Sequence, residues 1–322
     1  MALRWLVLLL LWPALVCAQL ATPMSTPGDF STVVLSNPVN WQSPLNRGLV
    51  SWWLNLPSLS GGGTTFRDIA GSNHGTLTSM ATPSTSTSGW NRTTRRGGWG
   101  HLAFDGTNDY VGVPSSTQFD FAGDFSVSAW IYATASTAFV DAVSRATSSL
   151  AQQWALEQIS GSRIDFYLQT SGGTYRAQNT TKWSVNMWHF VVGTLTGTTV
   201  RVYVDGVVGG TTATITGSFS SLPGTKVAMG AAGQNPANYW PGAIDDVRLY
   251  NRTLSALEVL ALYQGSLQGY PQTLNRIQLV GNAPVAAAGG TGNMLPFFTT
   301  RLLPTLRVAN DYEHHYLRAS GE

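Results

Sequence analysis

One short loop carries the residues whose types and spacing best suit ion binding. Asp105-Gly106 and Asn108-Asp109 lie within the stretch Ala103 to Val113, and both dipeptides are typical of turns. They place several side-chain oxygens a few residues apart, and a hard cation such as calcium takes oxygen ligands of this kind. The alternative is that these aspartates only shape the turn. The sequence alone leaves the two interpretations in balance.

Aromatic residues in loops form a second set with chemical potential. Such rings, where exposed, can stack on the faces of pyranose sugars. Buried, they would instead close the ends of a β-structure, and the sequence leaves both interpretations open. The candidates for ligand binding are Trp90, Trp99, Tyr239 and Trp240.

A hairpin must organise the elements that hold these loops in place. Met187 to Gly209 reads as two apolar strands joined by a tight turn. In its second arm Val200, Val202 and Val204 alternate with polar-tipped residues, and this period of two predicts a half-buried antiparallel strand. Asp205-Gly206 supplies a further turn signal. The hairpin is too small to be stable alone, so other sheets must pack on its valines.

Two further segments show an informative pattern. Phe125 to Ala133 alternates between an apolar face and a face that carries Trp130 and Tyr132, which is either a sugar platform or a second buried layer. Gly242 to Tyr250 alternates so that Asp245 shares a face with apolar residues. A carboxylate in that position is costly unless it is paired, hydrogen-bonded or bound to a metal.

Only one segment predicts a convincing helix, from Ser255 to Tyr263. Ser255 and Glu258 have the spacing of a capping box. Leu257, Leu260 and Ala261 form the expected apolar stripe.

Composition supports an all-β domain. Charged residues make up 11% of the 322, against about 25% in ordinary soluble domains, while 34 residues are glycine. Many short strands with glycine-rich turns and no repeat of 20 to 50 residues favour a β-sandwich over a propeller or a solenoid. The net charge is +2, and the one arginine cluster, Arg92, Arg95 and Arg96, lies in a loop. We therefore expect no nucleic-acid partner.

The ends of the chain differ from its middle. Residues 1–18 have the basic start, apolar run and small-residue end of a secretory signal peptide, with the single cysteine, Cys17, inside it. A start at Met24 is the alternative. Residues 19–47 read as a linker and residues 266–322 as an irregular tail, and we expect no membrane span in the mature chain.

Four segments together resemble the LamG-like jelly-roll domain of the concanavalin A-like lectin/glucanase superfamily. They are FDGTNDYVGVP, FSVSAWIYA, NMWHFVVGTLTGTTVRVYVDGVVGG and GAIDDVRLYNRTLSALEVLALY. The resemblance implies two antiparallel sheets, often a calcium ion, and commonly a role in binding carbohydrate or protein. Carried over onto the matching segments, it implies calcium ligands at Asp105 and Asp109, with Asp245 or Asp246 on the closing strand.

The same superfamily contains glycoside hydrolases, so the acids of the chain need inspection. Retaining hydrolysis needs two carboxylates about 5 to 5.5 Å apart. Glu157 is the one glutamate within the strand-rich region that the helix cap does not use, and its own strand holds no second acid. Asp165 on the facing arm can approach it, but a single cross-strand acid pair is more often structural. We expect no enzyme activity.

From the sequence we therefore expect a two-sheet antiparallel jelly-roll β-sandwich over residues 48–265, with one short C-terminal helix. Its expected role is non-catalytic binding of a glycan or a surface protein, with calcium as a candidate cofactor. A cleaved signal would make it secreted or place it at the cell surface. The alternatives are a structural domain of a virion or cell envelope, which a start at Met24 would favour, and a glycoside hydrolase.

Overall fold

The computed structural model of the chain describes residues 31–33, 38–55, 63–91, 100–137, 139–146, 152–160, 163–179, 183–219, 225–233, 237–267 and 278–280. The predicted signal peptide, Trp99 and most of the predicted tail lie outside these residues. Among the helices of the described part, none has the length and apolar character that a bilayer span requires.

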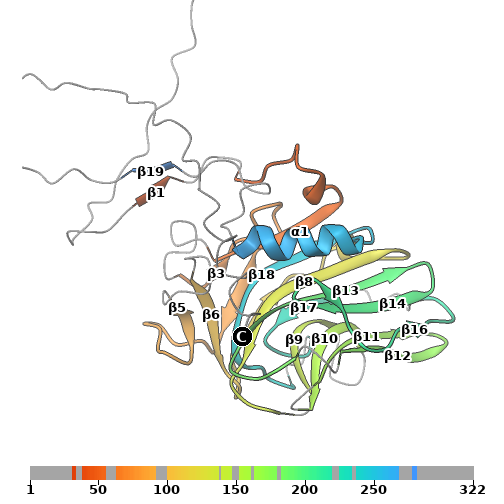
Figure 1. The fold of residues 1–322 in the computed structure, drawn as a ribbon. Coiled ribbons are helices and arrows are strands. Elements are labelled where there is room, and N and C mark those ends of the chain that lie inside the picture. The colour runs from red at the N-terminus through yellow and green to blue at the C-terminus, as the bar shows by residue number, and fades with distance from the viewer. Residues whose placement is uncertain are drawn as a thin grey trace, which may run out of the picture. The chain divides into compact units, whose positions relative to one another are not determined.

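Two antiparallel sheets contain most of the described strands (Figure 1). The eight-stranded sheet has the order β12 (Gly173–Asn179), β11 (Arg163–Thr170), β10 (Gln152–Ser160), β9 (Val140–Ala146), β17 (Lys226–Met229), β7 (Tyr110–Val113), β4 (Gly75–Thr78) and β3 (Thr65–Phe66). The nine-stranded sheet has the order β15 (Val207–Val208), β14 (Thr199–Val204), β13 (Trp188–Thr196), β8 (Phe125–Ala133), β18 (Pro241–Tyr250), β6 (His101–Asp105) and β5 (Gly89–Asn91), with β16 (Ala213–Thr214) on β14 and β2 (Leu49–Trp53) on β18.

The remaining described elements are short. Two 3-10 helices, η1 (Pro44–Asn46) and η2 (Thr117–Phe119), lie in connections, and the helix α1 (Ala256–Leu267) follows β18. β1 (Ser31–Val33) pairs antiparallel with β19 (Gln278–Val280). A segment of the predicted linker therefore pairs with a segment of the predicted tail.

The main core lies between the two sheets. The nine-stranded sheet contributes Val200, Val202 and Val204 to it, all fully buried, and the eight-stranded sheet contributes residues such as Leu156 and Phe166. The expectation that the three valines face a core is confirmed, and with it the two-sheet antiparallel β-sandwich.

Both turns of the organising hairpin form where the sequence predicts them. Thr196 pairs with Thr199, and Gly197 adopts a φ of 56° in the turn between them. Asp205 and Gly206 have φ values of 52° and 81°, as a two-residue turn with left-handed central residues requires. A side chain at Gly206 would also collide with Leu260 of α1, so glycine here permits close approach of the helix.

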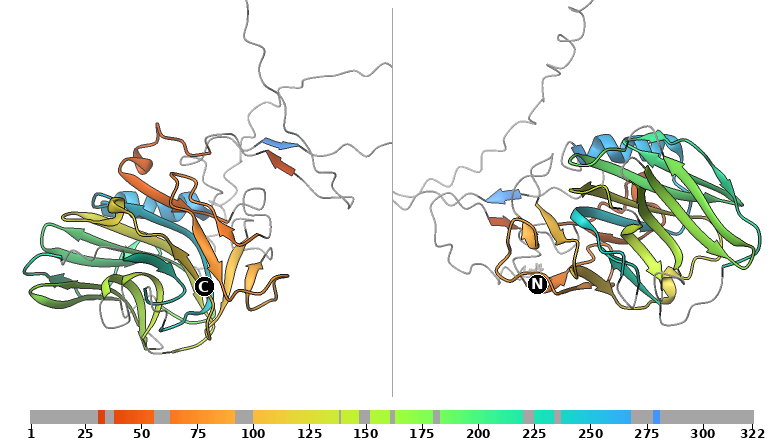
Figure 2. Two further views of the ribbon diagram at one scale, coloured as in Figure 1. Left: turned by 180° about the vertical axis from the view of Figure 1, so that it is seen from behind. Right: turned by 90° about the horizontal axis from the view of Figure 1, so that it is seen from below.

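A second hydrophobic cluster covers part of the outer face of the nine-stranded sheet, the face turned away from the eight-stranded sheet. There α1 packs on Trp130 and Phe190 (Figures 1 and 2). The predicted capping box is present, with Glu258 N–H donating to Ser255 Oγ and Ser255 N–H donating to Glu258 Oε2. The predicted apolar stripe is wrong at Leu257, whereas Ala261 packs against the second cluster.

Val259 and Leu262 are the helix residues that face the sheet, whereas Leu257 is 79% exposed. They lie three residues apart on one helical face, and Leu257 lies two residues before Val259, on the other side of the helix. The error in the stripe is therefore one of helix rotation, because the capping box fixes where the helix starts but not which side packs.

A β-bulge in β18 changes the face on which its acids lie. Asp245 pairs with Trp130 and Arg248 with Ser128, so three steps along β18 match two along β8. Asp246 takes up the extra residue with a φ of 52°. The prediction that Asp245 shares a face with the apolar residues of this strand is wrong beyond the bulge for this reason. Val247 lies in the main core, whereas Asp245 lies on the outer face.

Candidate functional site

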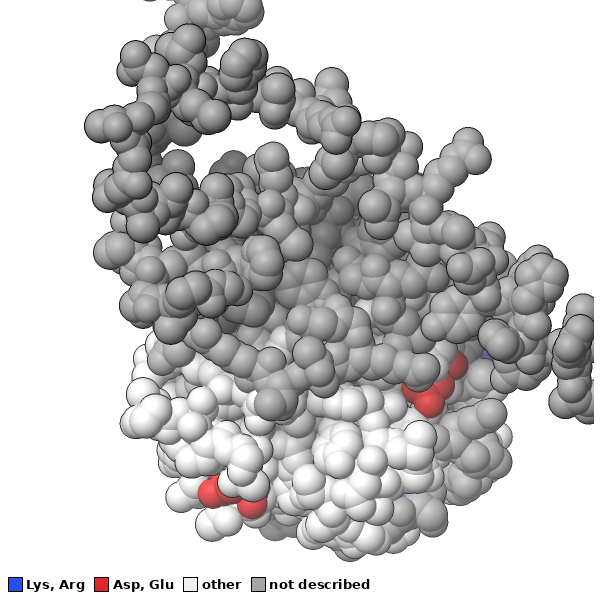
Figure 3. Space-filling view, turned by 60° about the vertical axis from the view of Figure 1, so that its left-hand side comes forward, with Lys and Arg blue, Asp and Glu red and all other residues white. Residues whose placement is uncertain are grey.

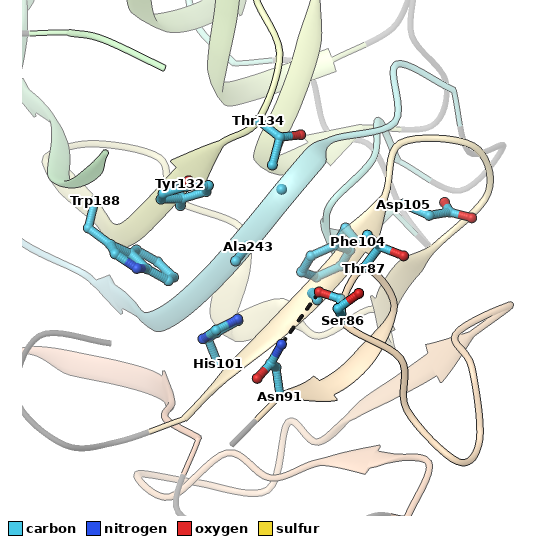
Figure 4. A pocket seen from close by; sticks show the side chains of 12 residues that line it. Ser86, Thr87, Asn91, His101, Phe104, Asp105, Tyr132, Thr134, Trp188 and Ala243 are labelled. Carbon is cyan, nitrogen blue, oxygen red and sulfur yellow. Dashed lines mark hydrogen bonds between the residues drawn. The ribbon is translucent and has the colours of Figure 1, made fainter. Parts of the chain in front are cut away.

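A pocket of about 370 Å³ opens on the outer face of the nine-stranded sheet, next to the part that α1 covers (Figure 4). A volume of this size falls in the range of small-ligand sites. The lining residues come from four adjacent strands, from β5 and from the loop before it. They are Ser86, Thr87, Asn91, His101, Ala103, Phe104, Asp105, Tyr132, Thr134, Trp188, Gly242 and Ala243.

The hollow forms because small residues occupy the middle of this face. Ala243 of β18 lies between Ala103 of β6 and Tyr132 of β8 in the sheet. The preceding residue, Gly242, has a φ of 149°, and a Cβ there would come within 1.9 Å of the Tyr132 carbonyl oxygen. Small side chains on two neighbouring strands thus leave a depression between larger ones.

Aromatic rings form one wall of the pocket. Trp188 of β13 pairs with Tyr132 of β8, and their ring centres lie 5.6 Å apart. His101 of β6 meets Trp188 edge-to-face at 5.3 Å. All three side chains are half-buried, so each is held in place yet remains accessible. This arrangement offers flat apolar surface of the kind that lines ligand sites.

Polar groups also line the pocket. Asp105 is exposed, and its Oδ1 accepts the backbone N–H groups of Thr107 and Asn108 at 2.8 and 3.2 Å. Asn91 Nδ2 lies 3.4 Å from the Ser86 carbonyl oxygen, and the exposed Thr134 holds its hydroxyl 3.1 Å from the Pro241 carbonyl oxygen. Residues with hydroxyl, amide and carboxylate groups therefore line the pocket together with the aromatic residues.

Charge is sparse around the pocket. Asp105 is the single acidic residue in the described lining, and neither lysine nor arginine occurs in it. The face shown in Figure 3 is mostly uncharged where it is described, apart from two small acidic spots.

The first two predicted calcium ligands lie at the end of β6. Asp105 N–H donates to Asp109 Oδ2 at 3.1 Å. Asp109 is buried, and loss of hydration raises the pKa of its carboxyl group above the usual value. The two residues therefore come together in one turn, as the sequence suggests.

The other two predicted ligands already have protein partners. Asp245 Oδ1 accepts the Asn55 N–H at 2.9 Å. Asp246 Oδ1 accepts Trp52 Nε1–H at 2.6 Å and Arg248 Nε–H at 2.8 Å. The Arg248 guanidinium also lies 3.9 Å from the centre of a Trp52 ring. Hydrogen bonds thus engage both buried carboxylates, and an ion pair compensates the charge of Asp246.

The structure does not bring the four aspartates into one cluster. In the register of β6 and β18, Asp105 pairs with Pro241, and Asp245 lies four residues further along β18. That offset is roughly 13 Å at 3.3 Å per residue, too far for shared ligation of one ion. Within the described ranges, no group of three or more His, Cys, Asp or Glu side chains is placed to hold a metal.

The predicted sugar-binding aromatics have different surroundings. Trp240 is 0% exposed and donates its Nε1–H to the Tyr132 carbonyl oxygen, so the prediction of a ligand-facing ring is wrong at this position. Trp90 packs edge-to-face on Phe66 and bonds to the Gly63 carbonyl oxygen. Tyr239 is half-buried. None of the three lines the pocket.

The pocket's own aromatics were harder to find from the sequence. Trp188 stands in the organising hairpin, and Tyr132 belongs to the strand face for which a sugar platform was one of two interpretations. The other member of that face, Trp130, is buried beneath α1. The strand face is thus a second buried layer at Trp130 and part of an accessible pocket at Tyr132. The contribution of His101 had no signal in the sequence, because it depends on β6 lying beside β18.

Glu157 and Asp165 do face each other across β10 and β11, as expected. Arg176 Nε lies 2.7 Å from Glu157 Oε1 and 3.9 Å from Asp165 Oδ2, while Arg163 Nε lies 3.0 Å from Asp165 Oδ1. Burial raises the pKa of Glu157, and it raises that of Asp165 to about 6. Both carboxylates are buried and engaged by arginine, which is the arrangement of an ion-pair network rather than of two acids open to a sugar.

A serine–histidine–aspartate chain appears where the sequence order gave no hint of one. His189 Nδ1 lies 2.8 Å from Asp205 Oδ2, and His189 Nε2 lies 3.2 Å from Ser184 Oγ. Nε2 also accepts the Ser184 backbone N–H at 3.3 Å, and the imidazole is only 3% exposed. This arrangement ties the segment before β13 to the turn after β14, and none of the three residues lines the pocket.

The fold and this pocket describe a lectin-like β-sandwich, and comparison with known families agrees. Residues 105–260 match the model of the concanavalin A-like lectin/glucanases superfamily. Over these residues the match confirms the resemblance that the sequence motifs carry. No curated protein sequence matches the chain.

Solved structures with the same fold include binding domains of toxins. The binding domain of Paraclostridial Mosquitocidal Protein 1 has a TM-score of 0.52 and 15% identity, with 70% of this chain and 56% of that chain covered. The binding domain of Botulinum Neurotoxin DC has a TM-score of 0.50 and 14% identity, with 69% and 52% covered, and is solved in complex with SialylT. The same toxin domain is also solved with rat synaptotagmin II.

Trypanosoma rangeli sialidase aligns over 33% of its chain at a TM-score of 0.49 and 16% identity, which carries no argument about activity. The present chain spans about half the length of the toxin domains. At these identities the similarities show the fold alone.

Proposed function

We propose that this domain is a non-catalytic carbohydrate-binding module and that the pocket on the nine-stranded sheet is its binding site. The observation that carries the proposal is the cluster of accessible rings of Trp188, Tyr132 and His101 in one pocket with polar residues such as Asn91. A pyranose ring has apolar faces formed by C–H groups and an edge of hydroxyl groups. The apolar faces suit stacking on the aromatic rings, and the hydroxyl groups suit hydrogen bonding to the carboxylate, amide and hydroxyl groups.

Two features support this role over a purely structural one. The aromatic rings lie half-exposed beside one another on a sheet surface, and contiguous exposed apolar patches are typical of interaction sites. In addition, a domain of the same fold has been solved with a glycan. A surface protein remains the second candidate partner, because that same domain has also been solved with rat synaptotagmin II.

A glycan array with the secreted or purified domain tests the proposal. We expect Trp188→Ala to weaken binding of the recognised glycan by about tenfold or more, equivalent to about 1.4 kcal/mol. Trp41→Ala is the matched control, because Trp41 is also a surface tryptophan, 45% exposed, and does not line the pocket. Equal losses in the two variants, or binding to no glycan at all, would contradict the proposal.

A second variant separates loss of binding from loss of folding. Ala243→Leu keeps every polar and aromatic group but extends a side chain into the hollow. We expect it to block binding while the urea unfolding midpoint changes little. Retained affinity in Ala243→Leu would place the glycan elsewhere.

Calcium and export are part of the proposal and have their own tests. The Asp105–Asp109 turn is the candidate for calcium assistance, because Asp105 lines the pocket and Asp109 lies in the same turn. Binding that persists unchanged in EDTA would remove calcium from the proposal. N-terminal sequencing of the mature protein distinguishes cleavage before Gln19 from a start at Met24.

A further inference from the structure

Three asparagines lie in the sequence context of N-linked glycosylation, in which serine or threonine follows two positions after the asparagine. They are Asn91, Asn179 and Asn251, and threonine stands at the third position in each case. The motif makes the three equivalent, whereas the structure places them in three different environments. An attached oligosaccharide is bulky and hydrophilic, so the folded protein can carry it only on an asparagine at its surface.

Asn179 is closed off by the fold. It lies at the end of β12 and is 0% exposed. A Cβ at Gly209 would come within 2.2 Å of the Asn179 Nδ2 atom, so the nitrogen that would carry the sugar lies against a neighbouring backbone. Protein interiors are too densely packed to admit a sugar ring at such a position. A glycan on Asn179 is therefore incompatible with this structure.

Asn91 lines the pocket on the nine-stranded sheet (Figure 4). Its Nδ2 lies 3.4 Å from the Ser86 carbonyl oxygen, which also belongs to a lining residue. A sugar bonded to this nitrogen would begin in the lining of the pocket and fill space that a ligand needs. Modification of Asn91 and binding of a ligand in the pocket therefore exclude each other.

Asn251 lies exposed in the turn between β18 and α1. Its backbone N–H donates to the Gly48 carbonyl oxygen at 2.9 Å, and the next residue, Arg252, binds Glu258 through Nη1 and Nη2 at 3.0 and 2.8 Å. These contacts hold the turn through the backbone of Asn251 and the side chain of its neighbour. The side-chain amide of Asn251 can therefore carry a substituent without breaking them.

The turn at Asn251 is also remote from the pocket. Ala243 of the pocket floor lies eight residues earlier, near the start of β18. At 3.3 Å per residue this places Asn251 roughly 25 Å along the strand from the hollow. A glycan on Asn251 would thus leave the pocket open.

From these environments we propose that the exported chain carries an N-linked oligosaccharide on Asn251 and none on Asn91 or Asn179. In the reaction, the C1–O bond of a lipid-diphosphate-linked oligosaccharide breaks and a bond forms between C1 and Asn251 Nδ2. The amide proton leaves with the lipid diphosphate. The inference rests on the export proposed above and not on the ligand of the pocket.

Expression of the full chain in eukaryotic cells that glycosylate exported proteins tests the proposal. Digestion with peptide-N-glycosidase and peptide mass spectrometry report the occupancy of each asparagine, in the cells and in the medium, so a variant that fails to fold is also measured. We expect the mobility shift on digestion to vanish in Asn251→Gln and to persist in Asn91→Gln. Thr253→Ser is the matched control that should keep the shift, because serine preserves the motif and the hydroxyl that donates to the Leu195 carbonyl oxygen at 2.6 Å.

The outcomes separate this inference from the other proposals. A chain that has lost its leader but carries no oligosaccharide on Asn251 would overturn the inference alone. Occupancy of Asn91 or Asn179 in the secreted protein would also overturn it. A chain that keeps residues 1–18 and carries no oligosaccharide would overturn export together with this inference, and it would leave glycan binding by the pocket intact.

Discussion

The outer face of the nine-stranded sheet has a covered half and an open half, and the same two strands supply both. In the covered half Trp130 and Phe190 lie beneath α1, where the ring of Tyr263 stacks on them at 5.7 and 6.4 Å. In the open half Tyr132 and Trp188 lie two residues further along the same strands and line the pocket. Aromatic residues two positions apart on the same strands are thus buried in one half and accessible in the other.

The difference shows that packing of α1, and not residue type, decides whether an aromatic strand face becomes core or accessible surface. Trp130 Nε1–H donates to Ser266 Oγ of the helix, so its polar atom is satisfied within the chain. The open half has no such cover among the described residues, and its neighbours Ala103 and Ala243 are small. The helix therefore completes a second core at one end of the face and leaves room for a ligand at the other.

Truncating one ring in each half should give the largest contrast. We expect Trp130→Ala to lower the free energy of unfolding by about 3 to 5 kcal/mol, because it removes a fully packed ring and leaves a cavity. Tyr132→Ala should cost about 1 kcal/mol, since its ring is half-exposed. Urea unfolding of both variants measures the difference. Equal losses would mean that the open half is packed as tightly as the covered half.

Charges in the two halves should differ in the same way, with a somewhat smaller effect. Asp246 is fully buried and paired with Arg248, whereas Asp105 is exposed at the pocket. Asp246→Asn should cost about 3 kcal/mol, because it leaves the guanidinium buried without its counter-charge. Asp105→Asn should change stability by less than about 0.5 kcal/mol. A neutral effect at Asp246 would show that water reaches the pair.

Much of this fold follows from local pattern, and the site does not. The alternation of Val200, Val202 and Val204, the Asp205-Gly206 turn and the Ser255–Glu258 cap are each determined within a few residues, so the sequence predicts them. The pocket depends on which strands become neighbours. His101 and Trp188 are far apart in the sequence. They meet because their strands, β6 and β13, lie in one sheet with only β18 and β8 between them.

The errors have the same physical origin. The bulge at Asp246 shifts Asp245 to the outer face, and no periodicity in the sequence reports an inserted residue. Trp240 lies just before a strand and looks like a loop residue, yet it packs 6.2 Å from Trp183 in the main core. Both are cases in which tertiary contacts override a local pattern.

Weakening the helix cap tests whether the cover itself maintains the contrast. Ser255→Ala removes the side chain that accepts the Glu258 N–H, and such losses cost about 1 kcal/mol. We expect the first turn of α1 to exchange its amide hydrogens faster, while glycan binding in the open half stays unchanged. Loss of binding in Ser255→Ala would show that the helix supports the pocket as well as the second core.

The outer face of the eight-stranded sheet is a third environment, in which the buried carboxylate of Asp165 lies beside arginine side chains. A change there should have the smallest effect on stability. Burial raises the folded-state pKa of Asp165 from 3.8 to about 6. Between these values the folded protein holds a proton that the unfolded chain has lost, so the contribution of Asp165 to stability is greatest below pH 4 and declines as the pH rises to 6. Asp165→Asn removes this titration.

The melting temperature of the wild type, measured relative to Asp165→Asn, should therefore fall between pH 4 and pH 6 and stay level above about pH 7. Comparison with the variant cancels the carboxylates common to both, including Glu258, whose pKa is lowered chiefly by its bonds to Arg252 and Ser255 against the opposing effect of burial. A relative melting temperature that rises over this range would mean that Arg163 and Arg176 stabilise the ionised form more than burial destabilises it.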